Sequence, residues 1–135
     1  MKSILIISPK EDDAILIRES LPSDYQVKNA DSVENALDLH RQSSFDVIFS
    51  DLELLRDSSK AKDIAEAINL FKEMNPLAEI LILSSKAFIN DTVKAIKAGA
   101  NNYLTYPIDP IEVRLVIESV NESVTQNLEL DYLRD

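Results

Sequence analysis

Three polar side chains that could do chemistry lie where short apolar runs of this sequence end. Ser8 and Ser84 each follow four consecutive apolar residues. Asp51 comes after a run of three apolar residues and is separated from it by Ser50. A carboxylate beside a hydroxyl can accept a phosphoryl group, hold a hard cation or bind a small polar ligand. The same residues can also do no more than satisfy backbone groups at the ends of strands. The residue types alone leave these alternatives open.

The apolar runs themselves predict the scaffold that brings these side chains together. Each run is too short for a helix and suits a strand buried on both faces. The predicted strands cover residues 3–8, 25–29, 45–51, 80–84 and 103–104, and five segments with helical spacing alternate with them. This alternation predicts an α/β fold, a five-stranded parallel sheet flanked by five helices. Right-handed crossovers then place Ser8, Asp51 and Ser84 at one edge of the sheet.

Capping residues predict where several helices begin and end. Asp31 is expected to cap the second helix, with Glu34 three residues later as in a capping box. Gly99, the only glycine in the chain, falls where a helix needs a left-handed residue. Residues 52–62 are charged and carry serines, which favours a loop before the next helix. His40, the only histidine, has no partner in sequence for a metal site or a nucleophile, and we expect it at the surface or at a boundary.

The final helix has a strong start signal and no stop signal. Asp109 is the expected cap and Pro110 the first helical residue, and apolar residues then recur every three or four positions to near Leu133. Such a helix is longer than the sheet needs. We therefore divide the chain into a domain, residues 1–120, and an extension, residues 121–135. The extension is expected to be a linker to an output domain or a dimerisation helix, and a polar tail is the alternative.

Composition excludes several classes of function. The chain has 135 residues, the size of one domain, and its 45% apolar content is enough for one core. Its net charge of −10 disfavours direct binding of nucleic acid, because phosphate backbones are repelled. Without cysteines there is no disulfide framework and no thiolate metal site. No apolar run reaches the roughly 20 residues of a membrane helix, so we expect a cytoplasmic protein without membrane contact.

Three segments of the chain resemble the receiver domain of bacterial two-component response regulators. Residues 4–21 resemble its first strand and helix, and residues 31–39 with residues 45–51 resemble its second helix and third strand. Residues 80–107 are the most specific part, through the sequence from Ile96 to Thr105. The resemblance covers nearly the whole chain. It implies a flavodoxin-like, doubly wound sheet and a signalling role rather than an enzymatic one.

The resemblance also implies roles for three residues. Asp51 takes the phospho-acceptor position. Ser84 takes the position of the hydroxyl that follows the phosphoryl group, and Tyr103 that of the aromatic residue that moves with it. If these roles are retained, Asp51 accepts a phosphoryl group from a histidine kinase with Mg²⁺ as cofactor.

Three departures from the family pattern point the other way. Ser8 and Pro9 stand where the family has a pair of acidic residues that helps to hold Mg²⁺, and Tyr106 stands where it has a lysine. The segment after Asp51 lacks the usual turn with proline and glycine. Phosphoryl transfer depends on positioning and on neutralising charge, so the loss of metal ligands and cation together is severe.

Other charged residues are poor replacements for the missing groups. Residues 11–13 are acidic, but they belong to the first turn of a helix, so recruiting one as a metal ligand needs a shift of that loop. Arg56, Lys60 or Lys62 could supply the missing positive charge. Such long side chains are usually solvated.

We therefore predict a degenerate receiver, or pseudo-receiver, with no cofactor and no metal site, which acts through protein partners. The resemblance implies a sensor histidine kinase, a covalently linked output domain of a transcription regulator, and a second copy of the chain. The expected docking face lies around Tyr103, Tyr106 and the last helix. The alternative is a working phospho-receiver with altered ligands. An enzyme or small-ligand protein on a similar fold is a third class, but a single glycine leaves no Gly-rich phosphate loop.

Overall fold

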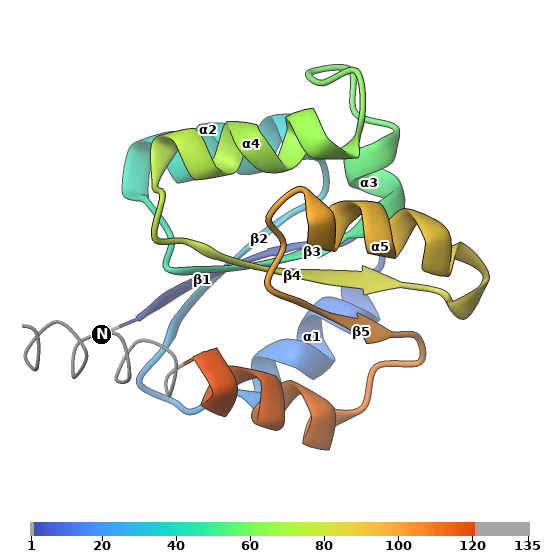
Figure 1. Ribbon diagram of the computed structural model, residues 1–135. Helices are drawn as coiled ribbons and strands as arrows, with labels where there is room; N and C mark the ends of the chain where they lie inside the picture. Colours follow the sequence, from blue (N-terminus) through green and yellow to red (C-terminus); the bar gives the residue numbers. More distant parts are fainter. Residues whose placement is uncertain (1, 121–135) are drawn as a thin grey trace, which may run out of the picture.

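A parallel sheet at the centre of the molecule positions everything else. The computed structural model describes residues 2–120, and its five strands lie in the order β2-β1-β3-β4-β5 (Figure 1). Every neighbouring pair is parallel, so the predicted five-stranded parallel sheet is confirmed. The strands are β1 (Ser3–Ile7), β2 (Gln26–Ala30), β3 (Val47–Asp51), β4 (Glu79–Ser84) and β5 (Asn102–Thr105).

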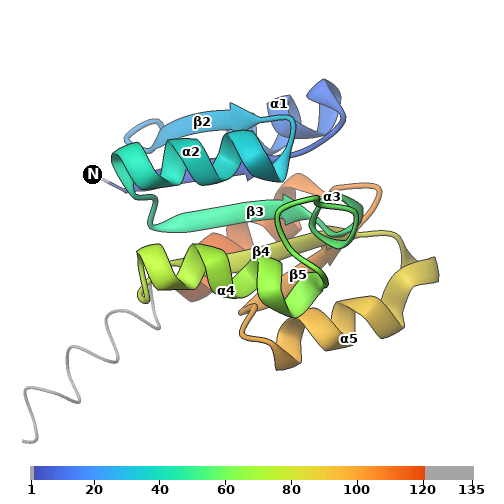
Figure 2. The same ribbon diagram turned by 90° about the horizontal axis from the view of Figure 1, so that it is seen from above.

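Helices cover both faces of this sheet. One face carries α2 (Val33–Ser43), α3 (Leu52–Arg56), α4 (Ile64–Met74) and α5 (Ile89–Lys97). The other carries α1 (Glu11–Ser20) and the C-terminal helix, which is described over residues 110–120 (Figure 1). From above, α2 and α4 lie side by side and run roughly along the direction of the strands (Figure 2). The short 3-10 helix η1 (Lys86–Phe88) directly precedes α5.

Two apolar layers, one on each face of the sheet, form the core. The central strands β1 and β3 contribute to both, because successive side chains of a strand point to opposite faces. Ile4 and Ile6 pack under α1 and the C-terminal helix, whereas Leu5 and Ile7 pack under α2 and α4. Strand β2 is an edge strand, and only its last residue, Ala30, is buried. The core therefore fixes the ends of β1, β3 and β4 side by side.

The prediction of a loop over residues 52–62 is wrong for the first half of that segment, which is helical. Residues 2–120 therefore hold six α-helices rather than the predicted five. Residues 52–56 form α3, directly after β3. Asp51 caps this helix, since its Oδ1 accepts the backbone N–H of Leu54 at 3.0 Å. Leu52 and Leu55 are both 1% exposed and anchor the helix on the core. The end of β3 is therefore also the start of a helix.

Other helix ends agree in part with the expectations. The cap of α2 is Ser32, which accepts the N–H of Asn35, and not Asp31, whose carboxylate accepts the Asn35 side-chain amide at 2.6 Å. Gly99 has φ +123°, and the backbone N–H of Ala100 bonds the carbonyl of Ala95 as in a Schellman ending. Asp109 accepts the N–H of Ile111 at 2.8 Å, so the expected cap of the C-terminal helix is confirmed.

His40 is not the surface or boundary residue that the sequence predicts, because it is 1% exposed. Its Nδ1 accepts the N–H of Phe45 at 3.1 Å, so the proton is on Nε2, which donates to the carbonyl of Phe71 at 3.1 Å. Burial lowers the pKa of His40. A neutral imidazole therefore links α2, the entry to β3 and the end of α4.

The last described residue, Val120, belongs to the C-terminal helix. The predicted extension, residues 121–135, and the linker or dimerisation role expected for it lie outside the described residues. Among the helices of residues 2–120, none combines the length and the apolar character that crossing a membrane requires.

Candidate functional site

A cavity of about 280 Å³ opens beyond the carboxyl ends of β3 and β4. It forms there because β1, β3 and β4 are parallel neighbours, so the connections that follow them diverge at one edge of the sheet. Its lining is mixed polar and apolar, and consists of Pro9, Lys10, Asp51, Leu52, Glu53, Leu83, Ser84, Ser85, Phe88 and Tyr106. We call this the Asp51 cavity. The predicted meeting of Asp51 and Ser84 at one edge of the sheet is thus observed.

Both carboxylate oxygens of Asp51 are engaged within the protein. The residue is 4% exposed. Oδ1 accepts the N–H of Leu54 as the cap of α3, and Oδ2 accepts the hydroxyl of Tyr106 at 2.6 Å. The second bond is short because a hydroxyl donates to a charged acceptor.

Tyr106 enters this bond as a neutral phenol. Burial raises the pKa of Tyr106 well above its usual range, and the hydrogen bond to the Asp51 carboxylate raises it further. The negative charges of Asp13 and Glu53 act in the same direction. Tyr106 therefore supplies a hydrogen-bond donor where a lysine would supply a cation. Among residues 2–120, no salt bridge to the Asp51 carboxylate is present.

The hydroxyl of Ser84 is directed toward α5. Thr92 donates its hydroxyl proton to the carbonyl of Phe88 at 3.1 Å. Since the Thr92 hydroxyl has one proton, Ser84 must be the donor in the 2.9 Å bond between the two hydroxyls. Ser84 is 3% exposed. Its hydroxyl proton is donated to Thr92 rather than to a group in the Asp51 cavity.

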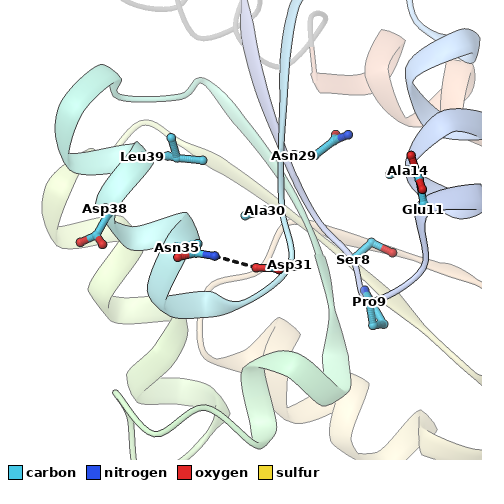
Figure 3. Close-up of a pocket in the computed structure, with 10 residues that line it drawn as sticks. All are labelled: Ser8, Pro9, Glu11, Ala14, Asn29, Ala30, Asp31, Asn35, Asp38 and Leu39. Carbon is cyan, nitrogen blue, oxygen red and sulfur yellow. Dashed lines mark hydrogen bonds between the residues drawn. The ribbon is translucent and has the colours of Figure 1, made fainter.

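Ser8 lies beside the Asp51 cavity but does not line it. Its Oγ donates to the carbonyl of Lys10 and accepts the N–H of the same residue, at 3.0 and 3.2 Å. Figure 3 shows Ser8 and Pro9 in a second, wider hollow at the ends of β1 and β2, with Asp31 hydrogen-bonded to Asn35. Pro9 alone of these lines both cavities. Both hydrogen bonds of the Ser8 hydroxyl thus stabilise the turn at Lys10.

The residues of the Asp51 cavity do not fit a magnesium site. Mg²⁺ needs near-octahedral oxygen coordination with one or two well-placed carboxylates. Each carboxylate oxygen of Asp51 already accepts a hydrogen bond from a protein donor. Glu53 is the only other carboxylate among the lining residues. Within residues 2–120, no three His, Asp or Glu side chains gather as metal ligands would.

The cation that lines the Asp51 cavity is Lys10, which sequence reasoning missed. Of the three cationic side chains considered from the sequence, Arg56 is committed elsewhere. It pairs with Asp57 at 3.1 Å and with Asp91 at 3.8 Å, and its guanidinium lies 5.2 Å from the centre of the Phe88 ring. Lys60 and Lys62 are not among the lining residues.

Tyr103 lies apart from the Asp51 cavity, on the outer surface. It is 41% exposed and borders a wide hollow of about 710 Å³ between α5, β5 and the C-terminal helix. The exposed apolar side chains of Ile89 and Leu115 line the same hollow. The two helices that border it carry three more exposed apolar residues, Val93 and Ile96 on α5 and Ile111 on the C-terminal helix. We call this surface the Tyr103 face.

Comparison with known proteins agrees with this geometry. The sequence model of the response regulator receiver domain matches residues 4–118. Over 122 residues the chain is 28% identical to the chemotaxis protein CheY of Halobacterium salinarum, which covers 88% of this chain and 96% of that protein. It is 31% identical over 91 residues to the alginate biosynthesis transcriptional regulatory protein AlgB of Pseudomonas putida, which covers 67% of this chain and 19% of AlgB.

Solved structures show the same fold. NtrX from Brucella abortus matches with a TM-score of 0.84 and 22% identity, over 98% of this chain and 29% of the NtrX chain. The chemotaxis response regulator CheY4 of Vibrio cholerae matches with a TM-score of 0.74 and 20% identity, over 89% of this chain and 98% of CheY4. The chain therefore spans nearly all of some relatives and a minor part of others.

Proposed function

This chain belongs to the response regulator receiver domain family, and we propose that it is an atypical member that signals by protein contact, without magnesium-dependent phosphorylation of Asp51. It is then a pseudo-receiver, a signalling module rather than an enzyme. The observation that carries this proposal is the 2.6 Å hydrogen bond from the Tyr106 hydroxyl to Oδ2 of Asp51.

Phosphoryl transfer makes two demands that this site meets poorly. The attacking oxygen must approach phosphorus in line with the leaving group, and the charge on the equatorial oxygens must be neutralised. Tyr106 occupies one Asp51 oxygen and the cap of α3 occupies the other. The residues that would hold a metal are replaced by Ser8 and Pro9, and Ser8 is turned into its own local bonds.

A working phospho-receiver is the second candidate, and one observation favours it. Asp51, Ser84 and the cation of Lys10 line one cavity. A histidine kinase could then transfer a phosphoryl group to Asp51 if Tyr106 moved aside and Lys10 took over charge neutralisation. Mg²⁺ would be a cofactor only in this case.

The Tyr103 face is the surface we propose for partners. Leu115 and Ile111 are 59% and 66% exposed on the C-terminal helix, and exposed apolar side chains that cluster in this way mark interaction sites. We propose a second copy of the chain, a histidine kinase or a linked output domain as partners, in the cytoplasm. The similarity to AlgB and to ZraR, both named transcriptional regulatory proteins, supports an output domain of that kind.

Acetyl phosphate with Mg²⁺ tests the proposed function directly. Intact mass and Phos-tag electrophoresis of the wild-type chain should show no modification of Asp51. The matched control combines Ser8→Asp, Pro9→Asp and Tyr106→Lys, which restores the family's acids and cation, and it should become modified. Stoichiometric phosphorylation of Asp51 in the wild-type chain would favour the second candidate and overturn the first.

A further inference from the structure

The hydrogen bond between Asp51 and Tyr106 joins two segments that are 55 positions apart in the sequence. Asp51 ends β3, near the middle of the sheet, and Tyr106 follows β5, at its edge. The bond therefore crosses the end of β4, and both of its residues line the Asp51 cavity. It is the side-chain contact that ties the acceptor position to the segment leading into the C-terminal helix.

Two further contacts make Tyr106 a fixed point of that segment. Its backbone N–H donates to the carbonyl of Ser84 at 3.0 Å, which extends the pairing of β5 with β4 by one residue. Its side chain packs against the core layer that contains Val113 and Ile117 of the C-terminal helix. Three residues later, Asp109 caps this helix. A displacement of the Tyr106 ring would therefore reach the helix and the Tyr103 face beside it.

We propose that Tyr106 is a latch on Asp51: its hydroxyl covers the oxygen that would attack phosphorus and holds the entry to the C-terminal helix in one position. Asp51 then acts as a hydrogen-bond acceptor, and the Tyr103 face is presented constitutively. Tyr106 is a positioning residue in this account. The inference rests on the proposed function, in which Asp51 is not used for phosphorylation.

The chemistry of the two groups explains why the latch stays closed. A phenol that donates to a carboxylate makes a strong bond because one partner is charged, and burial at this position keeps Tyr106 in the protonated, donating form. A phosphoryl donor would have to break this bond before Oδ2 could attack. It would then leave the Tyr106 hydroxyl in a largely buried place without its acceptor, which is unfavourable.

The latch makes the effects of two substitutions interdependent. Asp51→Ala removes the acceptor and Tyr106→Phe removes the donor, so either one opens the latch. Tyr106→Phe should therefore add little in the Asp51→Ala background, whereas Asp51→Ala still removes the cap of α3 in the Tyr106→Phe background. We expect the coupling in a double-mutant cycle to be roughly tenfold in the unfolding equilibrium constant, as for a hydrogen bond to a charged group. Backbone amide resonances of residues 106–112 should shift alike in both single variants.

The experiment uses the full chain, with NMR spectra and urea unfolding of the wild type, the two single variants and the double variant. In the wild type, the proton of the Tyr106 hydroxyl should give a slowly exchanging, low-field resonance, which needs no variant to be observed and is lost in both single variants. Tyr103→Phe, which removes a hydroxyl from the exposed face, and Asp12→Asn, on the exposed side of α1, are the matched controls. Both should leave residues 106–112 unchanged.

Two outcomes separate the latch from the proposed function. Additive effects of Asp51→Ala and Tyr106→Phe, in a chain that acetyl phosphate leaves unmodified, would overturn the latch and leave the proposed function standing. Modification of the wild-type chain on Asp51 would overturn the proposed function. In that case Tyr106→Phe must be modified faster than the wild type, and an equal or lower rate overturns the latch as well.

Discussion

The Asp51 cavity and the Tyr103 face differ in how far their side chains are satisfied by the protein itself. In the cavity, Asp51 bonds Tyr106 and Leu54, and Ser84 bonds Thr92. On the face, large apolar side chains such as Leu115 remain exposed. The polar groups of the cavity are hydrogen-bonded within the protein, whereas the apolar side chains of the Tyr103 face are accessible to a partner. This difference supports the proposal that the receiver acts through the Tyr103 face.

The largest expected effect on stability separates these two regions. Asp51→Ala removes the cap of α3 and leaves the buried Tyr106 hydroxyl without an acceptor, and it should lower the free energy of unfolding by about 2–3 kcal/mol. Leu115→Ala, on the exposed face, should change it by less than about 0.5 kcal/mol. Urea unfolding of the two variants measures both values. Equal values would remove the contrast between cavity and face.

The pH dependence of stability sharpens the role of Tyr106. Its pKa is raised in the folded protein, so the folded state holds its proton more tightly than the unfolded state does. The resulting stabilisation is fully present below the ordinary tyrosine pKa of about 10 and is lost as the pH rises above it, by up to about 1.4 kcal/mol per pH unit. Alkaline unfolding curves of the wild type and Tyr106→Phe should differ in this slope. Identical slopes would show that Tyr106 ionises as easily in the folded protein as in the unfolded chain.

A smaller effect is expected at the second closed bond of the cavity. Ser84→Ala removes the donor to Thr92, and since Thr92 still bonds Phe88, the free energy of unfolding should fall by only about 1 kcal/mol. Ser43→Ala, at an exposed position at the end of α2, is the control. Thermal or urea unfolding compares the two variants. A loss for Ser84→Ala as large as that for Asp51→Ala would contradict the assignment of Asp51 as the central acceptor.

The smallest effect on stability should accompany a large effect on association. Leu115→Glu places a charge on the Tyr103 face, where it remains solvated, so the free energy of unfolding should change by less than about 0.5 kcal/mol. Self-association, measured by size-exclusion chromatography with light scattering, should be lost. The matched variant Ile15→Glu changes an exposed apolar residue of α1, far along the chain from this face, and should retain the wild-type mass. Loss of association in both variants would argue against a specific face.

Most of the fold could be predicted from the sequence because it depends on local patterns. The alternation of apolar runs with helical spacing identified the parallel sheet, and Asp109 and Gly99 marked the ends of their helices correctly. Helix α3 was missed because Asp51 was considered only as the end of a strand. Its side chain also caps the following turn, and Leu52 and Leu55 supply the apolar contacts of a short helix.

The internal partners of the site could not be predicted, because they depend on contacts between distant segments. Tyr106 was identified as a departure from the family, but its bond to Asp51 forms only when β3 and the end of β5 meet across the sheet. His40 was expected at the surface or at a boundary, because its acceptor, Phe71, lies 31 residues away. Lys10 follows a proline and precedes an acidic turn, which is the pattern of an ordinary solvated lysine.

A titration with Mg²⁺ tests most directly the proposal that Asp51 is engaged by Tyr106 and binds no metal ion. Amide resonances of β3 and the start of α3 report on both Asp51 oxygens, because Leu54 donates to one of them. We expect no saturable shift of these resonances through the millimolar range of Mg²⁺. A saturable shift centred on Asp51, abolished by Asp51→Asn, would contradict it.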